Sequence, residues 1–264
     1  MDECPPVGAA LTSLAPFDPE TNQPAVPEGF PERLPPGSTI VIATDAWFPQ
    51  VNGVVTTMST LVERLREFGY RVVTITPEGQ TTVPMPTYPE IRLCVRPGKV
   101  VRDGLKDIAP DAFHIVTEGP LGFAARSWAL KRGIPFTTAY HTKFPEYLAA
   151  RFPVPISFGT RLIRWFHGPS AGVMVATPSL ARDLEGKGFR NVRPWTRGVA
   201  VDLFKPLDDP ADRDRLLPHA RPIGVYVGRI AVEKNIEAFL KTTAVATKVL
   251  IGGGPQMDSL RQRY

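Results

Sequence analysis

The chain contains few cysteines and no long hydrophobic run. Its 264 residues include only two cysteines, Cys4 and Cys94, which excludes a disulfide framework and a zinc site made of four cysteines. No apolar stretch approaches the ~20 residues that a helix needs to cross a bilayer. The acidic, proline-interrupted start does not resemble a secretory signal. We therefore expect a cytoplasmic protein, with peripheral contact at the inner face of the membrane left open.

Negative charge is concentrated at one end of the chain. Residues 1–38 contain nine prolines and six acidic residues but only one basic residue. They lack periodic apolar positions, so we expect a disordered tail. The whole chain still carries a net charge of +5, so the remainder is strongly basic. Such a surface favours phosphorylated ligands, acidic lipid or nucleic acid, and charge alone does not choose among them.

Short apolar runs alternate with helical patterns after the tail. The β-branched run 39–44 is typical of a strand buried on both faces of a parallel sheet. Repetition of the β-α order predicts a doubly wound α/β domain over 39–204, with a proline-rich loop at 77–89. Residues 205–221 are polar and broken by proline, which indicates a linker. The β-α order then restarts over 222–264.

Several candidate ligand contacts follow predicted strands of the first segment, where an α/β sheet binds its ligands. Asn52 and Gly53 open a helix, so Gly53 could bring backbone N–H groups against an oxyanion, or could merely serve a tight turn. Glu118 could bind a substrate hydroxyl or cap the next helix, and capping is the favoured interpretation. His141 could reach a substrate or be an ordinary hydrogen-bonded loop residue, whereas His114 lies inside a strand and is interpreted as structural.

The second segment repeats this geometry with cations added. Gly228 and Arg229 leave a predicted strand, and Lys234 stands at the start of the next helix. An arginine that donates two hydrogen bonds and a lysine point charge together suit a pyrophosphate. The alternative is a pair of solvated surface charges.

Two common sequence motifs, one for metal binding and one for dinucleotide binding, are either in an unsuitable place or incomplete in this chain. Asp212 and Asp214 match the letters of an Asp-x-Asp metal motif, but they lie in the predicted linker with an arginine between them. We therefore expect no metal. Neither glycine loop has the GxGxxG pattern followed by an acidic residue, which argues against a dinucleotide-dependent oxidoreductase.

A basic and aromatic stretch lies on a helix predicted over 158–167. Arg161, Arg164, Trp165 and Phe166 could rest on an anionic bilayer with the aromatic rings at the interface. An ordinary helix that packs its aromatic residues inward is the equally supported alternative.

Five ordered motifs within 39–264 resemble the family 4 retaining glycosyltransferases, which have the GT-B fold. Within that family the chain is most similar to bacterial mannosyltransferases and glucosyltransferases that act on lipid acceptors. The motifs are Asp45–Thr57, Thr117–Gly122, Tyr140–Leu148, Arg197–Phe204 and Val227–Asn235.

The resemblance implies a hexosyltransferase that moves mannose or glucose from a nucleotide-diphosphate sugar to a lipid or glycan acceptor, with retention. It implies neither a metal nor another cofactor, and no nucleic-acid partner. The loop of Gly53 would meet the donor diphosphate, as part of a donor site with Asn52, Glu118 and Gly228. His141 would contact the donor sugar near the reacting carbon. Two cations would neutralise the leaving group, namely Arg229 and Lys234.

The chain departs from the family pattern at two places. Ala200 stands where the family usually has an aspartate. A pair of glutamates that holds the donor sugar and ribose in the family would lie beyond Tyr264. The resemblance therefore implies one complete Rossmann-like domain plus the beginning of a second, with impaired transfer by this chain alone. A non-catalytic acceptor-binding or membrane-associated module of GT-B origin is the alternative.

Overall fold

The computed structural model describes residues 34–85, 88–141, 155–206, 210–218, 220–243 and 247–264. These residues form two compact units, the first ending at Arg197 and the second beginning at Gly198. Most of the expected acidic tail at 1–38 lies outside the described residues, and so does most of the motif from Tyr140 to Leu148.

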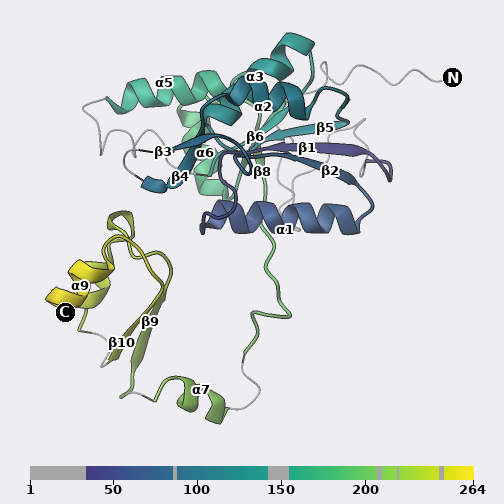
Figure 1. Ribbon diagram of the computed structural model, residues 1–264. Coiled ribbons are helices and arrows are strands. Elements are labelled where there is room, and N and C mark those ends of the chain that lie inside the picture. Colours follow the sequence, from purple (N-terminus) through teal and green to yellow (C-terminus); the bar gives the residue numbers. More distant parts are fainter. Residues whose placement is uncertain (1–33, 86–87, 142–154, 207–209, 219, 244–246) are drawn as a thin grey trace. The chain divides into compact units, whose positions relative to one another are not determined.

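The first unit is built on a parallel six-stranded sheet with the order β2-β1-β5-β6-β7-β8, which confirms the predicted α/β class. Helices cover both faces, α1 on one and α2 and α3 on the other (Figure 1). The strands are β1 (Thr39–Ala43), β2 (Arg71–Ile75), β5 (Ala112–Ile115), β6 (Thr137–Ala139), β7 (Gly172–Val175) and β8 (Val192–Pro194). The helices are α1 (Gly53–Glu67), α2 (Pro97–Gly104), α3 (Pro120–Arg132), α5 (Ile156–His167) and α6 (Pro178–Gly186).

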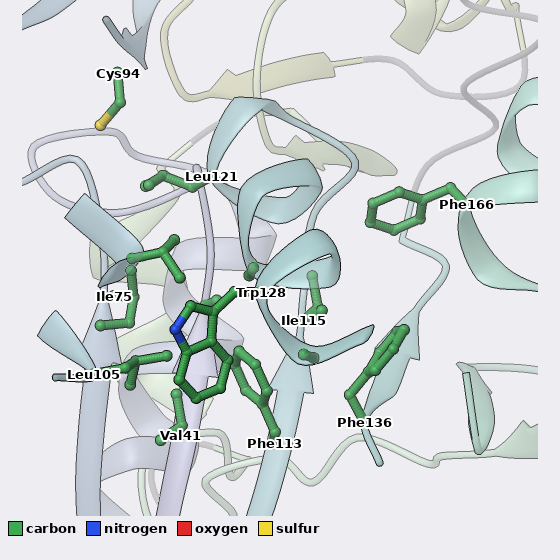
Figure 2. Close-up of a cluster of buried hydrophobic side chains, with 14 residues drawn as sticks. Val41, Ile75, Cys94, Leu105, Phe113, Ile115, Leu121, Trp128, Phe136 and Phe166 are labelled. Carbon is green, nitrogen blue, oxygen red and sulfur yellow. The ribbon is translucent and has the colours of Figure 1, made fainter. Parts of the chain in front are cut away.

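Strand β1 is buried on both faces, as its β-branched sequence predicts. Val41 and Ala43 face a core shared with α2 and α3, whereas Ile40 and Ile42 pack against α1 on the opposite face. Trp128 of α3 lies over the first of these cores, with its ring edge-to-face against Phe113 at 5.9 Å (Figure 2). The two cores hold β1, β2 and β5 between the helices on the two faces of the sheet.

One part of the first unit differs from the sequence prediction. Residues 77–89, expected to form a loop, contain strand β3 (Thr82–Met85), which pairs antiparallel with β4 (Tyr88–Cys94). Proline is tolerated in such a ribbon because a strand at an edge does not need every N–H for pairing. Arg92 also secures the hairpin by donating to the hydroxyl and carbonyl of Thr82, at 3.0 and 2.9 Å.

The second unit contains a parallel pair of strands, β9 (Ile223–Val227) and β10 (Thr247–Ile251), covered by α8 (Ile236–Lys241) and α9 (Met257–Arg263). Its core is small and centres on Ile230, Ile236 and Leu260. The segment 205–221, predicted as a linker, contains the short helix α7 (Pro210–Leu216). Both aspartates of the Asp-x-Asp letters lie on that helix.

Candidate functional site

The carboxyl ends of the parallel strands in the first unit gather polar residues from distant parts of the sequence. Asp45 follows β1, Glu118 follows β5, His141 follows β6 and Arg197 follows β8. Because all of these strands run the same way, their carboxyl ends meet at one edge of the sheet, where open α/β sheets bind ligands. The site is described below from these residues outward.

Asp45 ties β1 to the start of α3. Its side chain is buried, with 4% of the residue exposed, and its carboxylate accepts from the backbone N–H groups of Leu121 at 2.9 Å and Gly122 at 3.2 Å. The Thr117 hydroxyl donates to the same carboxylate at 2.9 Å. Burial raises the pKa of Asp45, while these hydrogen bonds oppose the rise. The Asp45 carboxylate therefore caps the N-terminus of α3, where the positive end of the helix dipole lies.

The expectation that Glu118 caps α3 is wrong, because Asp45 occupies those amides. The Glu118 side chain, 9% exposed, turns instead to His167 at the end of α5, with 3.2 Å between carboxylate and Nε2. The other ring nitrogen of His167 lies 2.8 Å from the hydroxyl of Thr138 in β6. A buried polar chain thus connects α5 to the ends of β5 and β6.

His141 and His114 both pack against Trp195, with ring centroids 6.1 and 5.8 Å from the indole. The Nδ1 atom of His141 lies 3.0 Å from a guanidinium nitrogen of Arg197. Burial and then the Arg197 charge lower the pKa of His141 to about 4. Burial, with a smaller effect of His141, lowers the pKa of His114 to about 3. Both rings are therefore neutral at neutral pH.

The two histidines share a second property. The Nε2 atoms of His114 and His141 are buried, and neither has a hydrogen-bond partner within the described residues. His114 also uses its Nδ1 atom, which lies 2.8 Å from the Thr137 hydroxyl on the neighbouring strand. A buried polar atom without a hydrogen-bond partner destabilises the folded protein. A ligand oxygen that formed a hydrogen bond with Nε2 of His141 would remove this cost.

Asn52 and Gly53 stand at the start of α1. The side-chain oxygen of Asn52 accepts from the N–H groups of Val54 and Val55, both at 3.0 Å, and so caps the helix. Gly53 is exposed, and a Cβ added to it would meet nothing within 4 Å. Neither packing nor backbone conformation requires glycine at position 53. Because glycine has no side chain, a ligand can reach the backbone N–H groups at the N-terminus of α1 without obstruction.

The strand-end loops of the second unit lie against each other. Gly228 donates to the carbonyl of Ile251 at 2.9 Å, and a Cβ on Gly252 would come within 1.9 Å of the Gly228 carbonyl oxygen. Gly228 also has a φ of +153°, which favours glycine. Arg229 is half-buried in this loop, and exposed Lys234 lies in the 3₁₀ turn before α8 rather than in its first turn. Both cations thus belong to the loop that follows β9.

Residues 51–203 match the model of Glycosyltransferase Family 4. The chain belongs to this family. It is 26% identical over 242 residues to a GDP-mannose-dependent alpha-mannosyltransferase of Mycobacterium tuberculosis, covering 83% of this chain and 63% of the relative. It is also 26% identical over 255 residues to an alpha-monoglucosyldiacylglycerol synthase of Streptococcus pneumoniae, covering 85% of this chain and 58% of the relative. This family 4 chain therefore spans about three fifths of the length of these relatives.

A solved structure supports the fold. The sucrose-phosphate synthase of Thermosynechococcus elongatus superposes with a TM-score of 0.64 at 17% identity, over 86% of this chain and 68% of that one. Similarity at this identity concerns the fold alone, and it confirms the GT-B fold class that the motifs predict.

Helix α5 presents an exposed aromatic and basic surface, defined here as the α5 face: Phe158, Arg161, Arg164 and Trp165. Trp165, 56% exposed, stacks on Phe123 at 6.2 Å, while Phe166 is fully buried. Phe166 therefore packs inward, as the second interpretation of this helix expects, whereas Trp165 is exposed and its contact with a bilayer stays a prediction. Among the helices formed by the described residues, none has the length and apolar character needed to span a bilayer.

Sequence reasoning gave no role to Asp45, His167, Arg197 or Phe158. The partners of Asp45 lie more than 70 positions away, those of His167 29 and 49 positions away, and that of Arg197 56 positions away. Only the position of Asp45 at the end of a strand could have pointed to it. Within the described part of the chain, no three His, Cys, Asp or Glu side chains converge as metal ligands would.

Proposed function

We propose that this family 4 chain transfers mannose or glucose from a nucleotide-diphosphate sugar to a lipid or glycan acceptor with retention of configuration. The observation that carries the proposal is the neutral His141 at the ligand-binding edge of the sheet, whose buried Nε2 atom has no hydrogen-bond partner among the residues that the structure describes. The names of the relatives, a mannosyltransferase and a glucosyl-lipid synthase, support the choice of sugar and of acceptor.

Two places in the chain, one in each unit and each considered by itself, have the chemistry of a diphosphate ligand site. At the first, the open N-terminus of α1 beside Gly53 offers backbone N–H groups and a positive dipole end. At the second, Arg229 and Lys234 provide positive charge in the loop after β9, where Gly228 allows a close backbone approach. These charges stabilise the nucleoside diphosphate as it leaves.

The reaction itself exchanges one bond at the anomeric carbon. The bond from that carbon to the phosphate oxygen breaks, and the acceptor hydroxyl oxygen bonds to the carbon on the same face. The acceptor proton leaves with the nucleoside diphosphate, which balances the transfer. His141 contacts the donor sugar near this carbon, and the carboxylate of Glu118, oriented by His167, accepts a hydrogen bond from a sugar hydroxyl.

A second candidate function is a non-catalytic, membrane-associated acceptor-binding module. The α5 face favours it, because exposed aromatic rings and arginines on one helix suit the interface of an anionic bilayer. The same face would also bring a glycosyltransferase to a lipid acceptor. Only binding of the donor and transfer of its sugar therefore distinguish the two functions.

Donor binding tests the proposed transferase function. Isothermal titration with GDP-mannose and UDP-glucose should show saturable binding of at least one of them. Arg229→Ala and Lys234→Ala should each weaken it roughly 10- to 150-fold, the value of one charge-assisted hydrogen bond. Arg71→Ala, an exposed arginine at the start of β2, serves as the matched control. Saturable binding that both loop substitutions leave unchanged would contradict the proposed diphosphate site.

A further inference from the structure

The His141 imidazole is fixed at one nitrogen and open at the other. Its Nδ1 atom lies 3.0 Å from Nη2 of Arg197, and its ring packs on Trp195. Its Nε2 atom is buried without a partner among the residues that the structure describes. The two ring nitrogens therefore have different tasks, and the neighbour at Nδ1 determines what Nε2 can offer.

Arginine leaves only one role for Nδ1. A guanidinium has five N–H donors, no acceptor, and stays protonated in proteins. Nδ1 must therefore accept the hydrogen bond and carry no proton. Since a neutral imidazole carries one proton, that proton is on Nε2.

We propose that Arg197 is a positioning residue that fixes His141 in the Nε2–H tautomer, so that a buried N–H donor faces the donor sugar. The Nε2–H group would donate to an oxygen lone pair of the sugar. With the proton on Nδ1 instead, Nε2 would present a lone pair and repel an oxygen that can only accept. The identity of the ligand rests on the proposed function, whereas the tautomer does not.

Other titratable groups do not compete for this role. Among the residues that the structure describes, His114 of β5 also packs on Trp195, and its pKa of about 3 keeps it neutral. Arg197 is the charge that lowers the pKa of His141, after burial. Removal of Arg197 should therefore allow His141 to populate both neutral tautomers. It should also raise the pKa of His141 toward its ordinary value.

Long-range ¹H–¹⁵N correlation of the ¹⁵N-histidine-labelled full chain tests the inference at neutral pH, with the His141 signals assigned by their loss in His141→Gln. The wild type should show a protonated Nε2 and an unprotonated Nδ1. Arg197→Met should populate both tautomers and raise the pKa of His141. Arg197→Lys should preserve the Nε2–H form, because an ammonium also only donates. Arg190→Met, at an exposed arginine elsewhere in the first unit, should change nothing.

The outcomes separate the inference from the proposed function. A protonated Nδ1 in the wild type, or an Arg197→Met variant that folds and keeps the wild-type tautomer and pKa, would overturn the role of Arg197. A wild-type Nε2 signal that shifts on addition of GDP-mannose or UDP-glucose supports both proposals. An intact tautomer whose Nε2 signal responds to neither donor overturns the proposed function, and with it the ligand assigned to the N–H group.

Discussion

At the scale of single residues, burial determines the protonation of the site. His141 and His114 are neutral because their rings are removed from water, and their pKa values fall to about 4 and about 3. The unfolded chain, with ordinary histidine pKa values near 6.5, binds these protons more readily. Protonation therefore favours unfolding below the unfolded-state value, and the stability conferred by these two rings is present only above it.

This difference in histidine pKa between the folded and the unfolded chain predicts that the folded state loses stability as the pH falls through a defined range. As pH falls from 7 to 5, each buried imidazole should cost the folded state about 2 kcal/mol of unfolding free energy. Urea unfolding across this range measures the loss. His114→Gln should remove about half of it, since glutamine does not titrate. A loss of stability between the two pH values that is the same in His114→Gln and the wild type would show that the His114 ring is not held neutral by burial.

Two glycines at the candidate site are expected to behave in opposite ways. A Cβ on Gly119 would lie 2.4 Å from the Asp45 carboxyl carbon, whereas one on Gly53 would meet nothing within 4 Å. Gly119→Ala should therefore cost roughly 1–3 kcal/mol of stability through overpacking. Gly53→Ala should leave thermal unfolding unchanged but weaken donor binding, because the methyl group blocks the start of α1. A Gly53→Ala variant with full donor affinity would argue against a diphosphate there.

At the scale of elements, α5 is fixed by its end and exposed along its face. Arg126 of α3 donates to the carbonyls of Trp165 and Phe166 at 3.0 and 2.9 Å and lies 4.0 Å above the Trp165 ring. This anchoring orients Trp165 without covering it. The Arg126 contacts therefore hold the carboxyl end of α5 while the α5 face stays exposed.

Vesicle flotation tests that surface. Phe158→Ser and Trp165→Ala should reduce binding to anionic vesicles, and added salt should reduce it further by screening Arg161 and Arg164. Phe68→Ser is the matched control, because Phe68 is an exposed aromatic residue at the end of α1. Equal flotation of the Phe158 and Phe68 variants would show that the α5 face does not contribute to membrane binding.

The elements also show what a single sequence can predict. Most strands and helices of the main sheet were predictable, because β1 is a β-branched run and α1 has apolar residues at helical spacing, but the sequence did not predict α2 or the short strand β8. The β3–β4 hairpin was not, since its prolines indicate a loop and its support from Arg92 is a tertiary contact. The Glu118–His167 and His141–Arg197 pairs are likewise long-range, so spacing along the chain gives no sign of them.

At the scale of the whole molecule, the chain combines two α/β units with complementary candidate roles. The first presents His141 and the open start of α1, and the second presents Arg229 and Lys234 in the loop after β9. Family 4 membership covers residues 51–203, which lie almost entirely in the first unit. Arg229 and Lys234, the proposed source of charge for the leaving group, lie in the second unit, outside the residues that match the family model.

The most direct test of the central claim is transfer itself. The full chain is incubated with labelled GDP-mannose or UDP-glucose and vesicles that contain a diacylglycerol acceptor, and the anomeric configuration of the product is read by NMR. The account predicts a glycolipid with the α configuration of the donor, lost in His141→Ala but kept in Arg190→Met. A β-linked product, or equal product from His141→Ala and the wild type, would contradict it.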